Sequence, residues 1–202
     1  MKRGRAFWII PFFAVGAGVS AFILWNGNLG GERLTNVMKS SSIGSEIACY
    51  KNVSAYQNGA KVTQSHGRHY AEDGYYYGQK WQCVEYVKRF YHDALKHHMP
   101  SVWGHAADFF DPQVNHGALN PARGLLQYHN GNTEKPKPDD LIVFRHSKLG
   151  HVAIVTKVTA DSVEVIQQNV SGAPTSTYSL VKENGNYMVG KKLQPAGWLR
   201  MP

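Results

Sequence analysis

Apolar and polar residues divide this chain of 202 residues into three regions. The first region, Ala6–Trp25, holds 20 consecutive residues without a charge, and Lys2, Arg3 and Arg5 precede it. Twenty apolar residues are enough for an α-helix to cross a bilayer, and basic flanking residues keep that end in the cytoplasm. We therefore expect residues 1–25 to be a transmembrane signal anchor in the inner membrane, with the rest of the chain facing the periplasm.

A cleaved signal peptide is the alternative for this region, and it would release a secreted protein. Val19-Ser20-Ala21 resembles a small-residue cleavage site, but the apolar run continues to Trp25, beyond the usual length of a signal sequence. The second region, 26–46, is rich in Gly, Ser and Asn and is typical of a flexible tether. The third region, 47–202, is long enough to bury a core of its own.

The first part of the third region shows strand, loop and helix patterns in turn. Ile47–Thr63 predicts a hairpin or two short strands around Asn58-Gly59, and His66–Gln79 has no clear period and predicts a loop. Apolar residues at helical spacing after Gln82 predict a helix that ends near His97-His98. Val102–Phe110 predicts a second, short helix.

The last part of the chain changes to strand patterns. The segment 113–140 is rich in Gly, Asn and Pro and predicts an irregular surface connection. After it come strand-like runs at Leu141–Phe144, His151–Val158, Ser162–Gln168, Ser176–Leu180, Tyr187–Val189 and Gly197–Arg200. Short spacings without helices between them indicate an antiparallel sheet. Helices followed by strands predict an α+β domain, with N-terminal helices packed on a C-terminal antiparallel sheet.

Net charge and cysteine content narrow the possible partners. The formal charge is +8, and it is spread along the chain and not gathered in one run. Such a surface suits anionic cell-wall polymers or lipids, and we expect no nucleic acid partner. The chain has two cysteines, Cys49 and Cys83, which an oxidising compartment could join. We expect both thiols to stay free, because a disulfide would consume the thiol of Cys83, around which the candidate site is built.

Cys83 and His151 are the candidate catalytic residues. Cys83 falls in the first turn of the predicted helix, where unpaired N–H groups and the helix dipole favour thiolate. These N–H groups, together with the neighbouring Gln82, could also hold the oxyanion of a tetrahedral intermediate. His151 begins a predicted strand, and its neutral imidazole could accept the thiol proton and return it to a leaving amine.

A third group should orient the imidazole of His151, and two amides are candidates. If residues 159–161 form the turn between two strands, His151 pairs with Asn169, and alternation places Gln167 on the same face as His151. Either amide oxygen could accept the imidazole N–H. A one-residue change of register would turn both side chains away, so the prediction depends on this turn.

Other polar and aromatic residues give weaker signals. His97-His98 and the histidines of 66–69 could bind a metal, but no cysteine or carboxylate cluster completes a site, so we expect neither a metal nor a cofactor. Tyr75-Tyr76-Tyr77 and Trp103 could line a substrate groove or pack in the core.

Four ordered motifs resemble the CHAP family of cysteine, histidine-dependent amidohydrolases/peptidases. They are Lys80-Trp81-Gln82-Cys83-Val84-Glu85-Tyr86, Pro138-Asp139-Asp140-Leu141-Ile142-Val143-Phe144, Gly150-His151-Val152-Ala153-Ile154-Val155 and Val165-Ile166-Gln167-Gln168-Asn169. Within this family they are most similar to the glutathionylspermidine amidase branch. The resemblance implies a papain-like α+β fold over 47–202, hydrolysis of a peptide-type amide, and the roles of nucleophile for Cys83 and base for His151.

Two positions depart from the pattern that the resemblance implies. The family often has a glutamate where this chain has Gln167, so the expected carboxylate is an amide here. The amidase branch tends to have an arginine five residues after the nucleophile, in contact with a substrate carboxylate. This chain has Lys88 there, which keeps the charge but loses the two-pronged hydrogen bonding.

Three functions follow from the sequence. The first is hydrolysis of small peptide-type amides, with peptidoglycan stem peptides as the substrate outside the cytoplasm. The second is hydrolysis of a glutathionylspermidine-type conjugate. The third is a non-catalytic binding domain, which the loss of the carboxylate at position 167 would suit, although an intact Cys-His pair argues against it. The sequence predicts no oligomeric state.

Overall fold

A computed structural model describes residues 42–202. The expected membrane anchor at Ala6–Trp25 and most of the expected tether lie outside these described residues. Within them, no helix combines the length and the apolar composition that crossing a bilayer requires.

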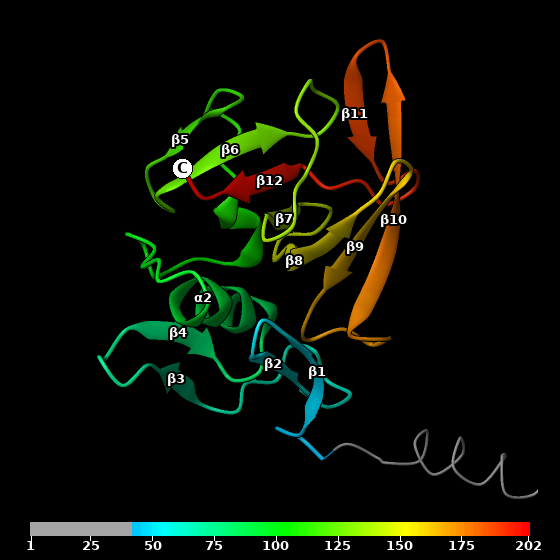
Figure 1. The fold of residues 1–202 in the computed structure, drawn as a ribbon. Helices are drawn as coiled ribbons and strands as arrows, with labels where there is room; N and C mark the ends of the chain where they lie inside the picture. Colours follow the sequence, from blue (N-terminus) through cyan, green and yellow to red (C-terminus); the bar gives the residue numbers. More distant parts are fainter. Residues whose placement is uncertain (1–41) are drawn as a thin grey trace, which may run out of the picture. The chain divides into compact units, whose positions relative to one another are not determined.

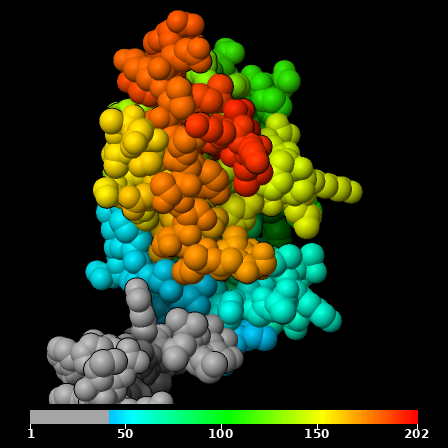
Figure 2. All heavy atoms as spheres, turned by 90° about the vertical axis from the view of Figure 1, so that its right-hand side faces the viewer, coloured from blue at the N-terminus to red at the C-terminus, as the bar shows by residue number. Residues whose placement is uncertain are grey.

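Eight antiparallel strands form the central sheet (Figure 1). Their spatial order is β11-β10-β9-β8-β7-β12-β6-β5. Their bounds are β5 Ala118–Asn120, β6 Leu125–His129, β7 Leu141–Phe144, β8 His151–Val158, β9 Ser162–Ile166, β10 Thr175–Glu183, β11 Asn186–Val189 and β12 Gly197–Arg200. The C-terminal strand β12 inserts between β6 and β7, so the end of the chain completes the sheet and is not an appendage. Figure 2 views the side on which β10, in orange, extends down the face of the molecule.

Two hairpins and one α-helix precede this sheet in the chain. The hairpins are β1 Glu46–Tyr50 with β2 Val53–Tyr56, and β3 Arg68–Tyr70 with β4 Tyr76–Gln79. The helix α2, Cys83–Asp93, lies between the β3–β4 hairpin and the sheet and packs on β4 and β8 (Figure 1). A 3₁₀ turn, η1 Ala106–Phe109, also contacts β7 and β8.

The strands around the site are apolar on both faces. On β8, Val152 and Ile154 belong to the core beneath α2, whereas Ala153 and Val155 belong to a second core on the opposite face. Strand β7 alternates in the same way, with Leu141 and Val143 beneath α2 and Ile142 and Phe144 opposite. Alternation with period 2 explains why these segments read as nearly continuous apolar runs. Burial on both faces fixes the register of the strand that begins with His151.

The predicted fold class is wrong. The described residues are mostly sheet and contain one α-helix, which follows two hairpins, so N-terminal helices do not pack on a C-terminal sheet. The segment predicted as a loop, 66–79, forms β3 and β4, because its tyrosines are strand-forming residues that pair across a hairpin. The predicted surface connection at 113–140 supplies β5 and β6.

The helices are shorter than the sequence pattern predicted. Residues 102–110 form only the single turn η1, because Gly104 adopts a positive φ of 111° before it and Phe110 is extended after it. Helix α2 ends at Asp93 with Ala94 as its C-cap, about one turn before the predicted end. Lys96 then takes a left-handed φ of 55°, which cannot continue a right-handed helix.

The pairing of β8 with β9 differs from the prediction near the turn and agrees with it near the site. The predicted turn would pair Val158 with Ser162, whereas the structure pairs Val158 with Val163. An irregularity in the middle of β8 then shifts the register by one residue, so that Ile154 pairs with Ile166 as predicted. Extended backbone beyond this pair brings His151 and Gln167 to the same face.

Candidate active site

A cavity of about 700 Å³ opens between the start of α2, η1 and the start of β8. Its lining includes Cys83, His151, Gln82 and Asn169, and its outer wall includes Tyr76 and Trp103. The volume suits a short peptide-like ligand. The cavity therefore brings together both predicted catalytic residues, although they lie 68 positions apart in the chain.

Cys83 is the first residue of α2 and is 8% exposed. Its N-cap, Gln82, has extended backbone, so the first N–H groups of the helix remain near the thiol. Burial raises the pKa of the Cys83 thiol, and backbone hydrogen bonds from Val152, Val84 and Cys83 itself only partly offset this effect. The prediction that the helix terminus lowers this pKa is wrong, because desolvation of the thiolate outweighs the donors. This shift favours the neutral thiol.

His151 begins β8, directly after Gly150. Gly150 has a φ of 69°, and a Cβ built on it would lie 2.5 Å from Ala107 N and 2.7 Å from Phe144 O. Glycine is thus required where the chain passes between η1 and β7 to enter β8. Burial lowers the pKa of His151, and its hydrogen bond with Gln167 offsets part of that shift. The imidazole is therefore neutral near pH 7 and able to accept a proton.

Gln167 fixes the tautomer of this imidazole. His151 Nε2 lies 2.9 Å from Gln167 Oε1, and Gln167 Nε2 donates to Ser176 Oγ at 2.8 Å. Because the amide nitrogen faces Ser176, the amide oxygen faces the imidazole and must accept a proton from Nε2. The Nδ1 atom of His151 then carries the free lone pair of the base. Gln167 is 5% exposed, so packing holds it in this orientation.

Asn169, the other candidate for this role, contacts the residue before the cysteine instead. Its Nδ2 donates to Gln82 Oε1 at 2.5 Å and to Val62 O at 2.7 Å, and its Oδ1 accepts from Asn58 Nδ2. Gln82 Nε2 in turn donates to Gln64 O at 2.7 Å. These contacts fix the amide of Gln82, whose nitrogen keeps a second hydrogen.

A buried polar network beneath the site was not predicted from the sequence. Gln168 Nε2 donates to Gln82 O at 3.0 Å and to Glu85 Oε2 at 2.7 Å, and both side chains are fully buried. Burial raises the pKa of Glu85, but hydrogen bonds from His69, Arg89 and Gln168 and the charge of Arg89 outweigh burial and lower it. The sequence signal for this network was the presence of two polar residues, Glu85 two positions after Cys83 and Gln168 directly before Asn169. They fasten the helix that carries Cys83 to the strand region that carries Gln167.

Lys88, predicted to contact a substrate carboxylate, is fully buried in the wall behind the cavity. Its ammonium donates to the carbonyls of Tyr76 and Val102, two residues that line the cavity. Burial and, secondarily, the charge of Arg123 lower the pKa of Lys88 to about 7. In this structure the side chain supports the backbone of the cavity wall.

Lys88 should make the stability of the protein depend on pH. Its pKa is about 7 in the folded state and 10.5 in the unfolded state, so the unfolded chain binds more protons between these values. Stability should therefore rise with pH from 7 to 9, by up to about 1.4 kcal/mol per unit. Urea unfolding at half-unit intervals should show this slope, and Lys88→Met should remove it. Lys157→Met, at a side chain 64% exposed, should leave the slope unchanged, and a slope that survives in Lys88→Met would contradict the prediction.

Both cysteines are free thiols, Cys49 exposed and Cys83 buried. Of the tyrosines predicted for a groove, Tyr76 lines the cavity beside Trp103, which is 65% exposed. Tyr75 and Tyr77 lie elsewhere, with the Tyr77 hydroxyl donating to Asp93 Oδ1 at 2.6 Å. Of the aromatic residues predicted for a groove, Tyr76 and Trp103 therefore line the cavity.

Three relatives of known name align with this chain. The bifunctional glutathionylspermidine synthetase/amidase of Escherichia coli (strain K12) is 29% identical over 134 residues, which cover 59% of this chain and 21% of the relative. The protein of the same name from Shigella flexneri gives the same values. The trypanothione synthetase of Crithidia fasciculata is 29% identical over 131 residues, covering 63% of this chain and 19% of the relative. The chain thus spans about a fifth of the length of these relatives.

The family comparison matches the part of the chain that carries the candidate catalytic residues. The model of the CHAP domain matches residues 74–169, a segment that contains Cys83, His151 and Gln167. This match and the amidase relatives support a hydrolase of the amidohydrolase type. The resemblance drawn from the four sequence motifs is confirmed, and residues 74–169 of this chain are similar to a CHAP domain.

Proposed function

We propose that this protein is a cysteine-dependent hydrolase of small peptide-type amides. The observation that carries the proposal is the cavity that a helix-terminal cysteine and a histidine both line, with the tautomer of the histidine fixed by a buried amide. Nucleophile, base and orienting group lie on three elements, α2, β8 and the segment after β9. Such a constellation suits acyl transfer through a thioester.

The proposed reaction begins with neutral Cys83 and neutral His151. As the sulfur attacks the amide carbonyl carbon, the thiol proton moves to His151 Nδ1, and Gln167 stabilises the imidazolium through Nε2–H. The N–H of Cys83 and the second amide hydrogen of Gln82 stabilise the oxyanion. The imidazolium then gives its proton to the leaving amine as the C–N bond breaks, leaving a thioester on Cys83. Water, deprotonated by His151, hydrolyses the thioester and restores the thiol.

The lining of the cavity favours a peptide over a polyamine conjugate. Among the described residues that line it, none is Asp, Glu, Lys or Arg, and its polar groups are amides, hydroxyls and histidines. A polyamine carries several ammonium groups, which need carboxylates to replace their hydration. We therefore propose stem peptides of peptidoglycan as the substrate class. The net charge of +8 supports this choice, because anionic cell-wall polymers attract a basic protein.

A product screen by mass spectrometry tests the proposal. Full-length protein is incubated with soluble muropeptides and, separately, with glutathionylspermidine, and Cys83→Ser serves as the matched control. We expect cleavage of an amide bond in the muropeptides by the wild type and none by the variant. Cleavage of glutathionylspermidine alone would keep the cysteine chemistry and reject the substrate class. Turnover that persists in Cys83→Ser would reject the cysteine mechanism.

A further inference from the structure

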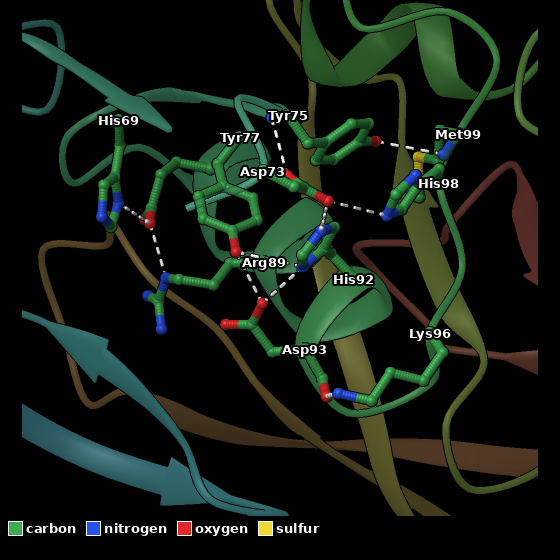
Figure 3. A network of polar contacts seen from close by, with 11 residues as sticks. His69, Asp73, Tyr75, Tyr77, Arg89, His92, Asp93, Lys96, His98 and Met99 are labelled. Atoms are coloured by element: carbon green, nitrogen blue, oxygen red, sulfur yellow. Dashed lines mark hydrogen bonds and ion pairs between the residues drawn. The ribbon is translucent and has the colours of Figure 1, made fainter. Parts of the chain in front are cut away.

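A second cluster of polar side chains lies at the opposite end of α2 from Cys83 (Figure 3). Asp73 comes from the turn between β3 and β4, His92 from the last turn of α2, and His98 from the loop after the helix. One metal-ligating atom from each residue lies within 4.8 Å of the other two. Asp73 Oδ2 is 3.0 Å from His92 Nε2 and 3.5 Å from His98 Nε2.

The hydrogen bonds around the cluster hold the Nε2 atom of His92 toward its centre. His92 Nδ1 lies 2.6 Å from Asp93 Oδ1, a carboxylate oxygen that also accepts from the Tyr77 hydroxyl at 2.6 Å. The Asp93 carboxylate stabilises a proton on Nδ1, whereas Nε2 hydrogen-bonds Asp73 Oδ2 at 3.0 Å and would release its proton when it binds a metal. Carboxylate–histidine pairs of this kind accompany most histidine metal ligands.

Asp73 is likewise held with one oxygen directed inward. Its Oδ1 accepts the backbone N–H of Tyr75 at 2.9 Å, whereas Oδ2 faces both histidines. The imidazole rings of His92 and His98 are stacked, with centroids 4.6 Å apart and an interplanar angle of 1°, and Figure 3 shows both beside the Asp73 carboxylate. Because an imidazole binds a metal in its ring plane, sharing one ion requires the more exposed ring, that of His98, to turn about its side-chain bonds. The side chains are 48%, 16% and 57% exposed for Asp73, His92 and His98, so an ion can reach them from solvent.

We propose that Asp73, His92 and His98 form a Zn²⁺ site, with water in the fourth position. Ligand atoms about 2.1 Å from a tetrahedral Zn²⁺ lie roughly 3.4 Å from one another. The two oxygen–nitrogen distances in the structure, 3.0 and 3.5 Å, bracket this value. Two imidazoles and one carboxylate are a ligand set that Zn²⁺ accepts readily, whereas Mg²⁺ and Ca²⁺ prefer oxygen ligands alone.

The sequence-based expectation of no metal considered His98 together with His97, and it missed both His92 and the carboxylate of Asp73. Asp73 is 19 residues before His92 and comes from a segment predicted to be an irregular loop, so only the β3–β4 hairpin brings them together. A bound ion would tie this hairpin turn to the end of α2. The inference does not rest on the proposed hydrolase activity, because none of the three ligands lines the catalytic cavity.

Metal titration of full-length protein tests this site. The protein carries Cys83→Ala, which removes the thiol of the catalytic cavity as a competing metal ligand. After treatment with EDTA and removal of the chelator, we expect one equivalent of Zn²⁺ by isothermal titration calorimetry. Co²⁺ should give visible absorption of a four-coordinate ion, and Zn²⁺ should raise the melting temperature, since it binds the folded state. His92→Gln and His98→Gln should each weaken Zn²⁺ binding at least about tenfold.

Two further variants separate a built site from scattered surface histidines. Asp93→Asn should weaken binding about 10- to 100-fold without removing a ligand, because it removes the carboxylate behind His92. His146→Gln, at an exposed histidine outside the cluster, should leave the affinity unchanged. Circular dichroism should be the same for all variants. No Zn²⁺-induced rise in melting temperature, or an affinity that His92→Gln and His98→Gln leave unaltered, would overturn the proposal.

Discussion

Replacing Cys83 or His151 by alanine should reduce hydrolysis of the proposed amide substrate by at least about 10³-fold. The thiol supplies the nucleophile and the imidazole supplies the only proton acceptor assigned to it, so neither can act without the other. Residues that act as one unit lose their effect together, and the double variant should therefore be no slower than the slower single variant. The measurement is the initial rate of product formation by chromatography with mass detection.

The matched control for this prediction is the second cysteine. Cys49 is exposed on β1 and does not line the cavity, so Cys49→Ala should keep wild-type activity. Cys83→Ala removes only a sulfur atom from the first turn of α2, and its melting temperature should stay within a few degrees of the wild type. Residual activity above a tenth of the wild-type rate in Cys83→Ala would be incompatible with a cysteine nucleophile.

The resting charge of the site depends on burial, which the sequence pattern did not reveal. A helix N-terminus stabilises a thiolate, and on that ground the sequence predicted a lowered pKa for Cys83. In the structure α2 is enclosed between a hairpin and the sheet, so desolvation dominates and raises the pKa of this thiol. Burial lowers the pKa of His151 for the same reason. Both shifts favour the uncharged pair, and the proposed mechanism therefore couples proton transfer to the attack of the sulfur.

The strands that carry the site were predictable because their signal is local. Segments β7 and β8 are rich in β-branched residues and are bounded by turn residues, and the structure contains both. The strands β3, β4, β5 and β6 gave no such signal, because each is only three to five residues long and none contains a run of β-branched residues. The fold class was wrong for this reason. The segment predicted to be irregular supplies β5 and β6 to the sheet, and the described part of the chain contains one α-helix.

The placement of Gln167 beside His151 depends on two register differences that cancel, and no local sequence pattern predicts them. The predicted turn gives the wrong pairing at Val158, and an irregularity within β8 restores the predicted pairing at Ile154. Alternation then places Gln167 beside His151, as expected, whereas Asn169 adopts a left-handed φ of 62° and turns toward Gln82. Periodicity cannot anticipate such a turn, because a positive φ interrupts the strand.

Gln167→Glu should preserve or raise activity above neutral pH and should move the acidic limb of the pH–rate profile upward. The wild-type pKa of His151 is lowered by burial, so activity should be lost only as pH falls below the ordinary range for histidine. A carboxylate in place of Gln167 Oε1, 2.9 Å from Nε2, would stabilise the imidazolium in the resting enzyme and in the transition state. Stabilising the imidazolium in the resting enzyme raises the pKa of His151 and so moves the acidic limb upward. Stabilising it in the transition state lowers the barrier, so the rate above this limb is preserved or raised.

Comparison with alanine variants decides which amide orients the base. Gln167→Ala should lower kcat/KM by about 10²-fold, because the imidazole loses the acceptor that fixes its tautomer. Asn169→Ala should cost less, since it loosens Gln82 and leaves the His151–Gln167 bond in place. Rates measured from pH 5 to 9 on one substrate separate the limb shift from the change in plateau. If Asn169→Ala proves the slower enzyme, and Gln167→Glu leaves the acidic limb where it was, the orienting role belongs to Asn169, and the contact of His151 with Gln167 has no catalytic consequence.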